Sequence, residues 1–217
     1  MVAVSTTSGR HRRSSVIKRK PASNLHHAIR IAEARGLPLT HFVTINFSET
    51  SCPPEEASHR FEKMRKSYFD PWVRRPSRLL KTVKCSPTHV WVVEAAGGVT
   101  GVHWLVHLPR GRVDDFKRRI AQWVSAVTGG PISREAIDVR PAATPKNLGR
   151  YILKGTDPLY APFYGAKHVP QGEVIGKRSG YSRNLGPTQK RRMKEDGSYT
   201  VKQAPFALSR LARGLAA

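Results

Sequence analysis

The stretch that decides the fold is residues 88–108, THVWVVEAAGGVTGVHWLVHL. Two runs rich in β-branched and aromatic residues, Thr88 to Ala96 and Thr100 to Leu108, flank the pair Gly97-Gly98. Such runs are typical of strands, and a glycine pair between two of them is typical of a tight turn. The stretch therefore predicts an antiparallel hairpin.

Outside the hairpin the sequence shows both helical and strand periodicity. Alternating apolar residues predict a strand over His41 to Phe47, and a short strand is expected over 136–140. Apolar residues at a spacing of about 3.6 predict helices that start at Ser23 or Asn24 and at residues 54, 113 and 144. Hairpins without regular strand–helix–strand units indicate an α+β fold, with helices packed on a central antiparallel sheet.

The charge balance indicates the class of partner. The 217 residues include 38 Lys or Arg and 15 Asp or Glu, which gives a formal net charge of +23. So large an excess predicts a polyanionic partner, and nucleic acid is the first candidate. The sequence has neither a long apolar run nor the apolar segment of a signal peptide, so we expect a cytoplasmic protein without a membrane partner. Two cysteines, Cys52 and Cys85, are too few for a disulfide framework.

Composition divides the chain into three regions. Residues 1–22 carry six basic residues and no acid, which predicts a flexible basic arm. Residues 23–158 contain the regular elements and form the predicted domain, and residues 159–217 are a basic, glycine-rich C-terminal extension. Basic and aromatic residues alternate in this extension, so it is either a DNA-contacting loop or a solvated basic tail. The candidate DNA contacts are Lys177, Arg178, Tyr181, Arg183, Lys190, Arg191 and Arg192.

The hairpin carries a candidate metal site. Side chains two apart on a strand share a face, so Gly101, His103 and His107 point to the same side. Glu94 is on the preceding strand of the predicted hairpin, close enough to His103 for the carboxylate and the imidazole to share a divalent cation if they face the same side. His107 is about 13 Å from His103 along the strand, too far to bind the same ion. The alternative role for His103 is that of a hydrogen-bonded sheet histidine.

Tyr151 and Lys154 are the second candidate pair. They are three apart in the predicted helix over 144–154 and therefore share a face. A tyrosine can attack phosphorus when a cation polarises the phosphodiester and an ammonium group stabilises the phenolate. The alternative is a core tyrosine beside a lysine whose aliphatic stem is buried.

Three segments together resemble the HUH endonucleases, specifically the single-tyrosine rolling-circle replication initiators of plasmids and small phages. They are FVTINF (42–47), EAAGGVTGVHWLVHLP (94–109) and NLGRYILKG (147–155), which occur in the order found in that family. They span about half of the chain.

The resemblance implies roles for four residues. Glu94 and His103 take the places of metal ligands for magnesium or manganese, Tyr151 that of the nucleophile, and Lys154 that of a lysine supporting the phosphate. The implied activity is nicking of one DNA strand at a single-stranded or hairpin origin. The tyrosine forms a 5′-phosphotyrosyl link, and the freed 3′-hydroxyl primes synthesis. Whether a host helicase is a further partner stays open.

One position departs from the family pattern. Gly101 stands where the family has the first histidine of its pair, and glycine has no side chain to bind a metal. A related single-stranded DNA-binding protein with weak or absent cleavage is therefore an alternative. A basic RNA-binding protein of ribosomal type is a second, and composition alone favours it equally.

Overall fold

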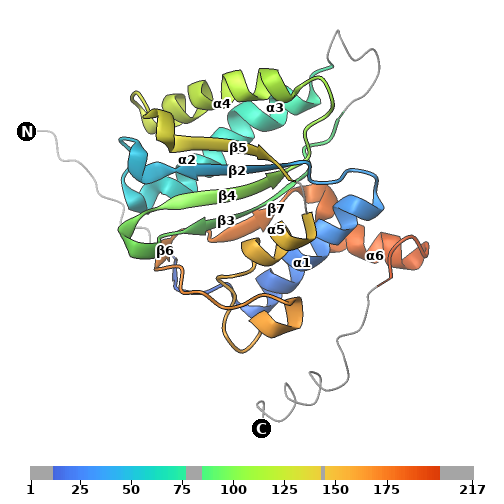
Figure 1. Cartoon of the computed structure of the whole chain (residues 1–217). Helices are drawn as coiled ribbons and strands as arrows, with labels where there is room; N and C mark the ends of the chain where they lie inside the picture. The colour runs from blue at the N-terminus through green and yellow to red at the C-terminus, as the bar shows by residue number, and fades with distance from the viewer. Residues whose placement is uncertain (1–11, 77–84, 143–144, 201–217) are drawn as a thin grey trace, which may run out of the picture.

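The computed structural model describes residues 12–76, 85–142 and 145–200 and has an α+β fold (Figure 1). A five-stranded antiparallel sheet has the order β5-β2-β4-β3-β7. A short two-stranded sheet pairs β1 with β6. The strands are β1 (Arg13–Ser14), β2 (His41–Asn46), β3 (His89–Glu94), β4 (Gly101–Val106), β5 (Ile137–Pro141), β6 (Val174–Ile175) and β7 (Ser179–Tyr181).

The predicted hairpin is confirmed as β3 and β4. A 3₁₀ turn, Ala96–Gly98, joins the two strands, and Gly97 and Gly98 adopt φ of 60° and 79°. Positive φ is readily adopted by glycine, which explains the glycine pair in the sequence. The register places Glu94 opposite Gly101 and Val92 opposite His103.

Three helices, α2 (Ala57–Met64), α3 (Asp70–Arg74) and α4 (Val113–Thr128), cover one face of the sheet (Figure 1). A π-helical turn, Arg65–Phe69, joins α2 to α3, so the helical segment predicted to start near residue 54 continues to Arg74. Pro71 falls in the first turn of α3. The core of this layer is aromatic, with Phe69 against Trp104 at a ring-centroid distance of 4.6 Å.

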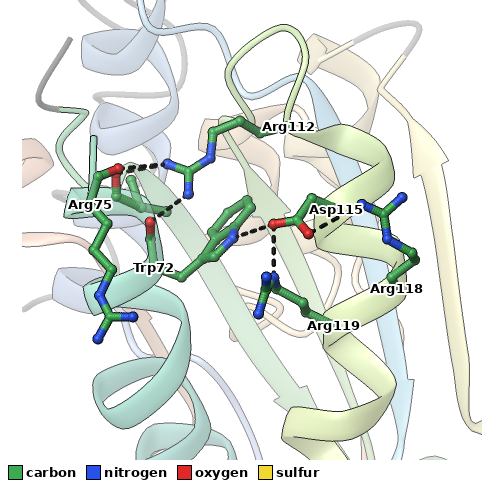
Figure 2. Close-up of polar contacts among 7 residues, drawn as sticks. Trp72, Arg75, Arg112, Asp115, Arg118 and Arg119 are labelled. Atoms are coloured by element: carbon green, nitrogen blue, oxygen red, sulfur yellow. Dashed lines mark hydrogen bonds and ion pairs between the residues drawn. The ribbon is translucent and has the colours of Figure 1, made fainter. Parts of the chain in front are cut away.

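Arg112 holds α3 and α4 together (Figure 2). Its guanidinium donates hydrogen bonds to the carbonyl oxygens of Trp72 at 2.7 Å, Val73 at 3.2 Å and Arg75 at 3.3 Å. These carbonyl groups lie at the C-terminal end of α3, where the helix itself provides no N–H donor for them. The indole Nε1 of Trp72 donates in turn to Asp115 on α4 at 2.8 Å. The buried arginine therefore has a structural role.

The opposite face is covered by α1 (Arg19–Ala34), α5 (Pro145–Ile152) and α6 (Pro187–Glu195) (Figure 1). Buried residues of α1, among them Leu25 and Ile31, pack in one cluster with Val92 and Leu105 of the sheet. The helix begins at Arg19, four residues before the predicted cap at Ser23.

The predicted boundaries at residues 22 and 158 do not separate structural units. In the predicted flexible arm, β1 pairs with β6, and Ile17 is 3% exposed and donates its N–H to Gly155 at 2.8 Å. In the predicted extension, β7 forms an edge strand of the main sheet, and Met193 and Tyr199 are buried in the cluster that includes α1. The sequence does not reveal these contacts of residues 12–22 and 159–200, because the pairing partners are distant in the chain. Residues 1–11 and 201–217 lie outside the described residues.

Both cysteines are free thiols, Cys52 buried and Cys85 partly exposed. None of the helices in the described ranges is long and apolar enough to cross a bilayer.

Candidate active site on the β3–β4 hairpin

Two strands and one helix bring the predicted site residues together. Glu94 ends β3, His103 lies in the middle of β4, and Tyr151 is on α5, with Lys154 just beyond the end of that helix. Glu94 and His103 face the same side of the sheet, which the sequence left as a condition, because Glu94 lies opposite Gly101 and the two side chains are 3.1 Å apart.

The four side chains form a continuous polar chain. Nε2 of His103 lies 3.1 Å from Oε2 of Glu94 and 3.3 Å from the hydroxyl oxygen of Tyr151. Nζ of Lys154 lies 2.9 Å from the same Glu94 oxygen. The carboxylate therefore contacts both an imidazole and an ammonium group, and the imidazole contacts a phenol.

Tyr151 is at the surface. Its side chain is 40% exposed, which is high for an aromatic residue in this fold. Its ring meets His103 edge-on at a centroid distance of 5.0 Å and Phe42 at 5.7 Å. The alternative of a core tyrosine is wrong, because the ring is exposed, and its hydroxyl contacts His103.

Two further residues hold the imidazole, and sequence reasoning missed both. Phe42 stacks on His103 with a centroid distance of 5.3 Å and an interplanar angle of 17°. The hydroxyl of Thr44 lies 3.2 Å from Nδ1 of His103. The signal that could have found them is the β2 alternation, since Phe42 and Thr44 share a face and Thr44 lies directly opposite His103 in the β2–β4 register.

The environment of Glu94 keeps it ionised. The residue is only 8% exposed, and burial by itself raises the pKa of its carboxyl group. The hydrogen bond and charge of His103, followed by those of Lys154, outweigh burial and hold the pKa below its usual value. The site therefore contains an ionised carboxylate at neutral pH, in contact with the side chains of His103 and Lys154.

The residues present do not make the three-ligand metal site that the resemblance implies. Glu94 and His103 supply two donors, and Gly101 supplies none. Among the residues that the structure describes, no group of three or more His, Cys, Asp or Glu side chains can hold a metal ion. His107 is no substitute, since its Nδ1 lies 2.7 Å from the carbonyl oxygen of Pro38. Magnesium or manganese at Glu94 and His103 stays a prediction.

A basic groove of about 560 Å³ lies between the segment 12–18 and the β6–β7 region. Three of the predicted DNA contacts line it, Lys177, Arg178 and Tyr181, together with Lys18 of the N-terminal segment. The remaining predicted contacts are not among the groove-lining residues. Arg183 precedes α6, and Lys190, Arg191 and Arg192 lie on α6.

Arg178 corrects the sequence interpretation. Its side chain is buried, with 6% exposed, and its guanidinium donates to the carbonyl oxygens of Ser14 and Gly172. These bonds join the N-terminal segment to the chain before β6. Arg178 therefore stabilises the wall of the groove and is not available to a phosphate. Arginine side chains are usually expected at the surface. Arg178 is buried because it bonds to Ser14, which is distant in the chain, so the sequence alone does not indicate its burial.

Comparison with known proteins identifies no relative. No family model matches the chain, and no match is found among curated proteins or among solved structures. The functional interpretation therefore depends on the geometry of the site and on the resemblance of three sequence segments.

Proposed function

We propose that the chain is a DNA-nicking endonuclease of the replication-initiator type, in which Tyr151 attacks a phosphodiester of single-stranded DNA at an origin. The observation that carries the proposal is the exposed Tyr151 hydroxyl 3.3 Å from Nε2 of His103, which is itself 3.1 Å from Glu94. The Thr44 hydroxyl, 3.2 Å from the other ring nitrogen, can orient this base, and a nucleophile within hydrogen-bond reach of an oriented base is the arrangement that nucleophilic catalysis requires.

The chemical step is a transesterification. The phenol oxygen of Tyr151 forms a bond to phosphorus while the bond from phosphorus to the 3′ oxygen breaks. In the tautomer whose Nδ1–H donates to Thr44, Nε2 of His103 carries no hydrogen and takes the phenol proton, and the departing 3′ oxygen takes that proton from the imidazolium. Glu94 stabilises the transient imidazolium, and the Thr44 hydroxyl 3.2 Å from Nδ1 accepts its other N–H. The products are a 5′-phosphotyrosyl link and a free 3′-hydroxyl.

The charge distribution supports a nucleic-acid substrate. The chain carries a formal net charge of +23, and Lys18, Lys177 and Tyr181 all line the groove. Cations that hold phosphates next to an aromatic ring that can stack on a base are typical of single-stranded nucleic-acid binding. The assignment to an origin depends on the sequence resemblance.

The direct test uses a pool of random-sequence single-stranded DNA labelled at its 3′ ends and incubated with manganese. A 5′-phosphotyrosyl product carries the label with the protein on a denaturing gel. We expect the adduct with the wild type and with Tyr160→Phe, a matched control outside the site, and none with Tyr151→Phe. An adduct that persists in Tyr151→Phe would contradict the proposal.

Two other outcomes identify the alternatives. Tight binding of the DNA pool by the wild type with no adduct would favour a DNA-binding protein that has lost cleavage, as Gly101 in the place of a histidine suggests. Stronger binding to structured RNA than to single-stranded DNA at about 0.15 M salt would favour the RNA-binding alternative, since charge alone attracts both polymers.

A further inference from the structure

We propose that the ammonium group of Lys154, and not a bound divalent metal ion, supplies the positive charge that stabilises the phosphate while Tyr151 attacks. The inference rests on the proposed function, because it specifies which cation serves that reaction. It departs from the magnesium or manganese site that the sequence resemblance implies.

Lys154 already occupies the cation position of the site. Its Nζ is 2.9 Å from Oε2 of Glu94, the oxygen that also contacts His103, and 3.8 Å from the centroid of the Tyr151 ring. A magnesium ion binds carboxylate oxygens at about 2.0–2.1 Å, so a metal on this oxygen would be placed close to the ammonium group. The Lys154 ammonium group and a metal ion would compete for the Glu94 carboxylate. The ammonium group is part of the chain and is therefore always present.

The main chain fixes the ammonium group near the nucleophile. The N–H of Lys154 donates to the carbonyl oxygen of Tyr151 at 3.1 Å, and its carbonyl oxygen accepts from Val169 at 2.9 Å. The next carbonyl, that of Gly155, accepts from Ile17 at 2.8 Å. The lysine side chain is only 17% exposed. A charge held in this way needs little reorganisation when negative charge develops on a phosphate, and such preorganisation is the main source of electrostatic catalysis.

Because residue 101 is a glycine, the sheet surface beside Glu94 carries no side chain at the position where a third metal ligand would be expected. Gly101 lies between Asn46 and Glu94 in the register of three adjacent strands. A Cβ at this position would lie 3.3 Å from the carbonyl oxygen of Ile45, so a larger residue fits after a small shift. The glycine therefore leaves the site without a metal ligand at the position where the family has its first histidine.

In the inferred step Lys154 donates a hydrogen bond to a non-bridging oxygen of the phosphate. His103 takes the phenol proton and returns it to the 3′ oxygen, so no metal ion is needed to balance the reaction. Loss of one such donor typically costs about 10²–10³-fold in rate. Lys154→Gln should therefore lower the rate of adduct formation by that factor. Lys154→Arg should keep part of the activity because the charge is retained.

The first experiment compares adduct formation on the random single-stranded pool in EDTA and in manganese. We expect equal yields for the wild type, the reduction described above for Lys154→Gln in both conditions, and no change for Lys167→Gln, an exposed control. An adduct that forms only with manganese would overturn the inference and leave the proposed function standing. No wild-type adduct in either condition would overturn the proposed function itself.

The second experiment measures metal binding without DNA. Manganese is titrated into the full chain and followed by electron paramagnetic resonance of the free ion. We expect no saturable binding by the wild type and a new saturable site in Gly101→His, which restores the third ligand. Saturable binding by the wild type that Glu94→Gln abolishes would overturn the inference, whatever the activity of either variant.

Discussion

The hydroxyl of Tyr151 lies 3.3 Å from Nε2 of His103, although the two residues are 48 positions apart in the chain. The contact depends on how closely α5 packs against α1. Gly149 on α5 is so close to α1 that a Cβ there would lie 3.1 Å from Cδ1 of Ile29. The position of the candidate nucleophile is therefore set by helix packing as well as by the sheet.

Thr44 should control the orientation of the imidazole. Its hydroxyl, 3.2 Å from Nδ1, is the partner that fixes which nitrogen of His103 faces Tyr151. Thr44→Val keeps the shape and removes the hydroxyl, so we expect adduct formation to slow by about 10–100-fold, the usual cost of removing an orienting partner. Binding of single-stranded DNA should be unchanged, as measured by fluorescence anisotropy. Thr188→Val, at an exposed position on α6, is the control, and an equal rate in both variants would refute this role.

Local patterns in the sequence were enough to predict the hairpin and two candidate pairs of site residues, and only the resemblance of three segments implied that the two pairs belong to one site. Alternation along β3 and β4 fixes the faces of Glu94 and His103, and the helical spacing of three residues pairs Tyr151 with Lys154. The edge of the sheet was not predictable in the same way. The edge strand β7 has three residues, and β1 and β6 of the separate two-stranded sheet have two each, so none of them carries a detectable period. They form because segments distant in the chain pair in three dimensions, Arg13 with Ile175 in the small sheet and Val90 with Tyr181 at the edge of the main sheet.

The groove should determine affinity for DNA without affecting the chemistry at Tyr151. Lys18 and Lys177 line it from opposite segments of the chain. Replacing either lysine by glutamine should weaken binding to all single-stranded sequences alike. It should also lower the slope of log affinity against log salt by about 0.7 for each phosphate that the protein no longer neutralises. Anisotropy titrations at several salt concentrations measure both effects. Lys63→Gln, on α2, serves as the control, and an unchanged slope in both groove variants would exclude this binding mode.

Gly172 should be essential for the position of Glu94. The residue has φ of 66°, and a Cβ would lie 2.1 Å from the carbonyl oxygen of Ala95, the residue after Glu94. Gly172→Ala forces this backbone apart, and we expect a decrease of at least about 3 kcal/mol in the free energy of unfolding. Gly197→Ala is the matched control, with φ of 74° and nothing within 4 Å of the added Cβ. It should cost only about 1 kcal/mol, from the backbone conformation alone. Urea unfolding of both variants gives the comparison, and similar decreases would show that the clash with Ala95 can relax.

His27 should make the fold sensitive to mild acid. Its Nδ1 lies 2.8 Å from the hydroxyl of Tyr199, and burial, with the nearby charge of Lys190, lowers its pKa to about 4. Smaller contributions in the same direction come from His26, Arg30 and Lys194. The unfolded chain binds a proton near the ordinary pKa of about 6.5, so stability is complete above that pH and falls as the pH drops toward 4. In His27→Gln we expect this decrease in stability to be smaller by about 1 kcal/mol. The effect is limited to this size because solvent screens the partly exposed ring. Urea unfolding at pH 7.5 and at pH 5 measures it, and an identical pH dependence in wild type and variant would assign the acid sensitivity to other groups.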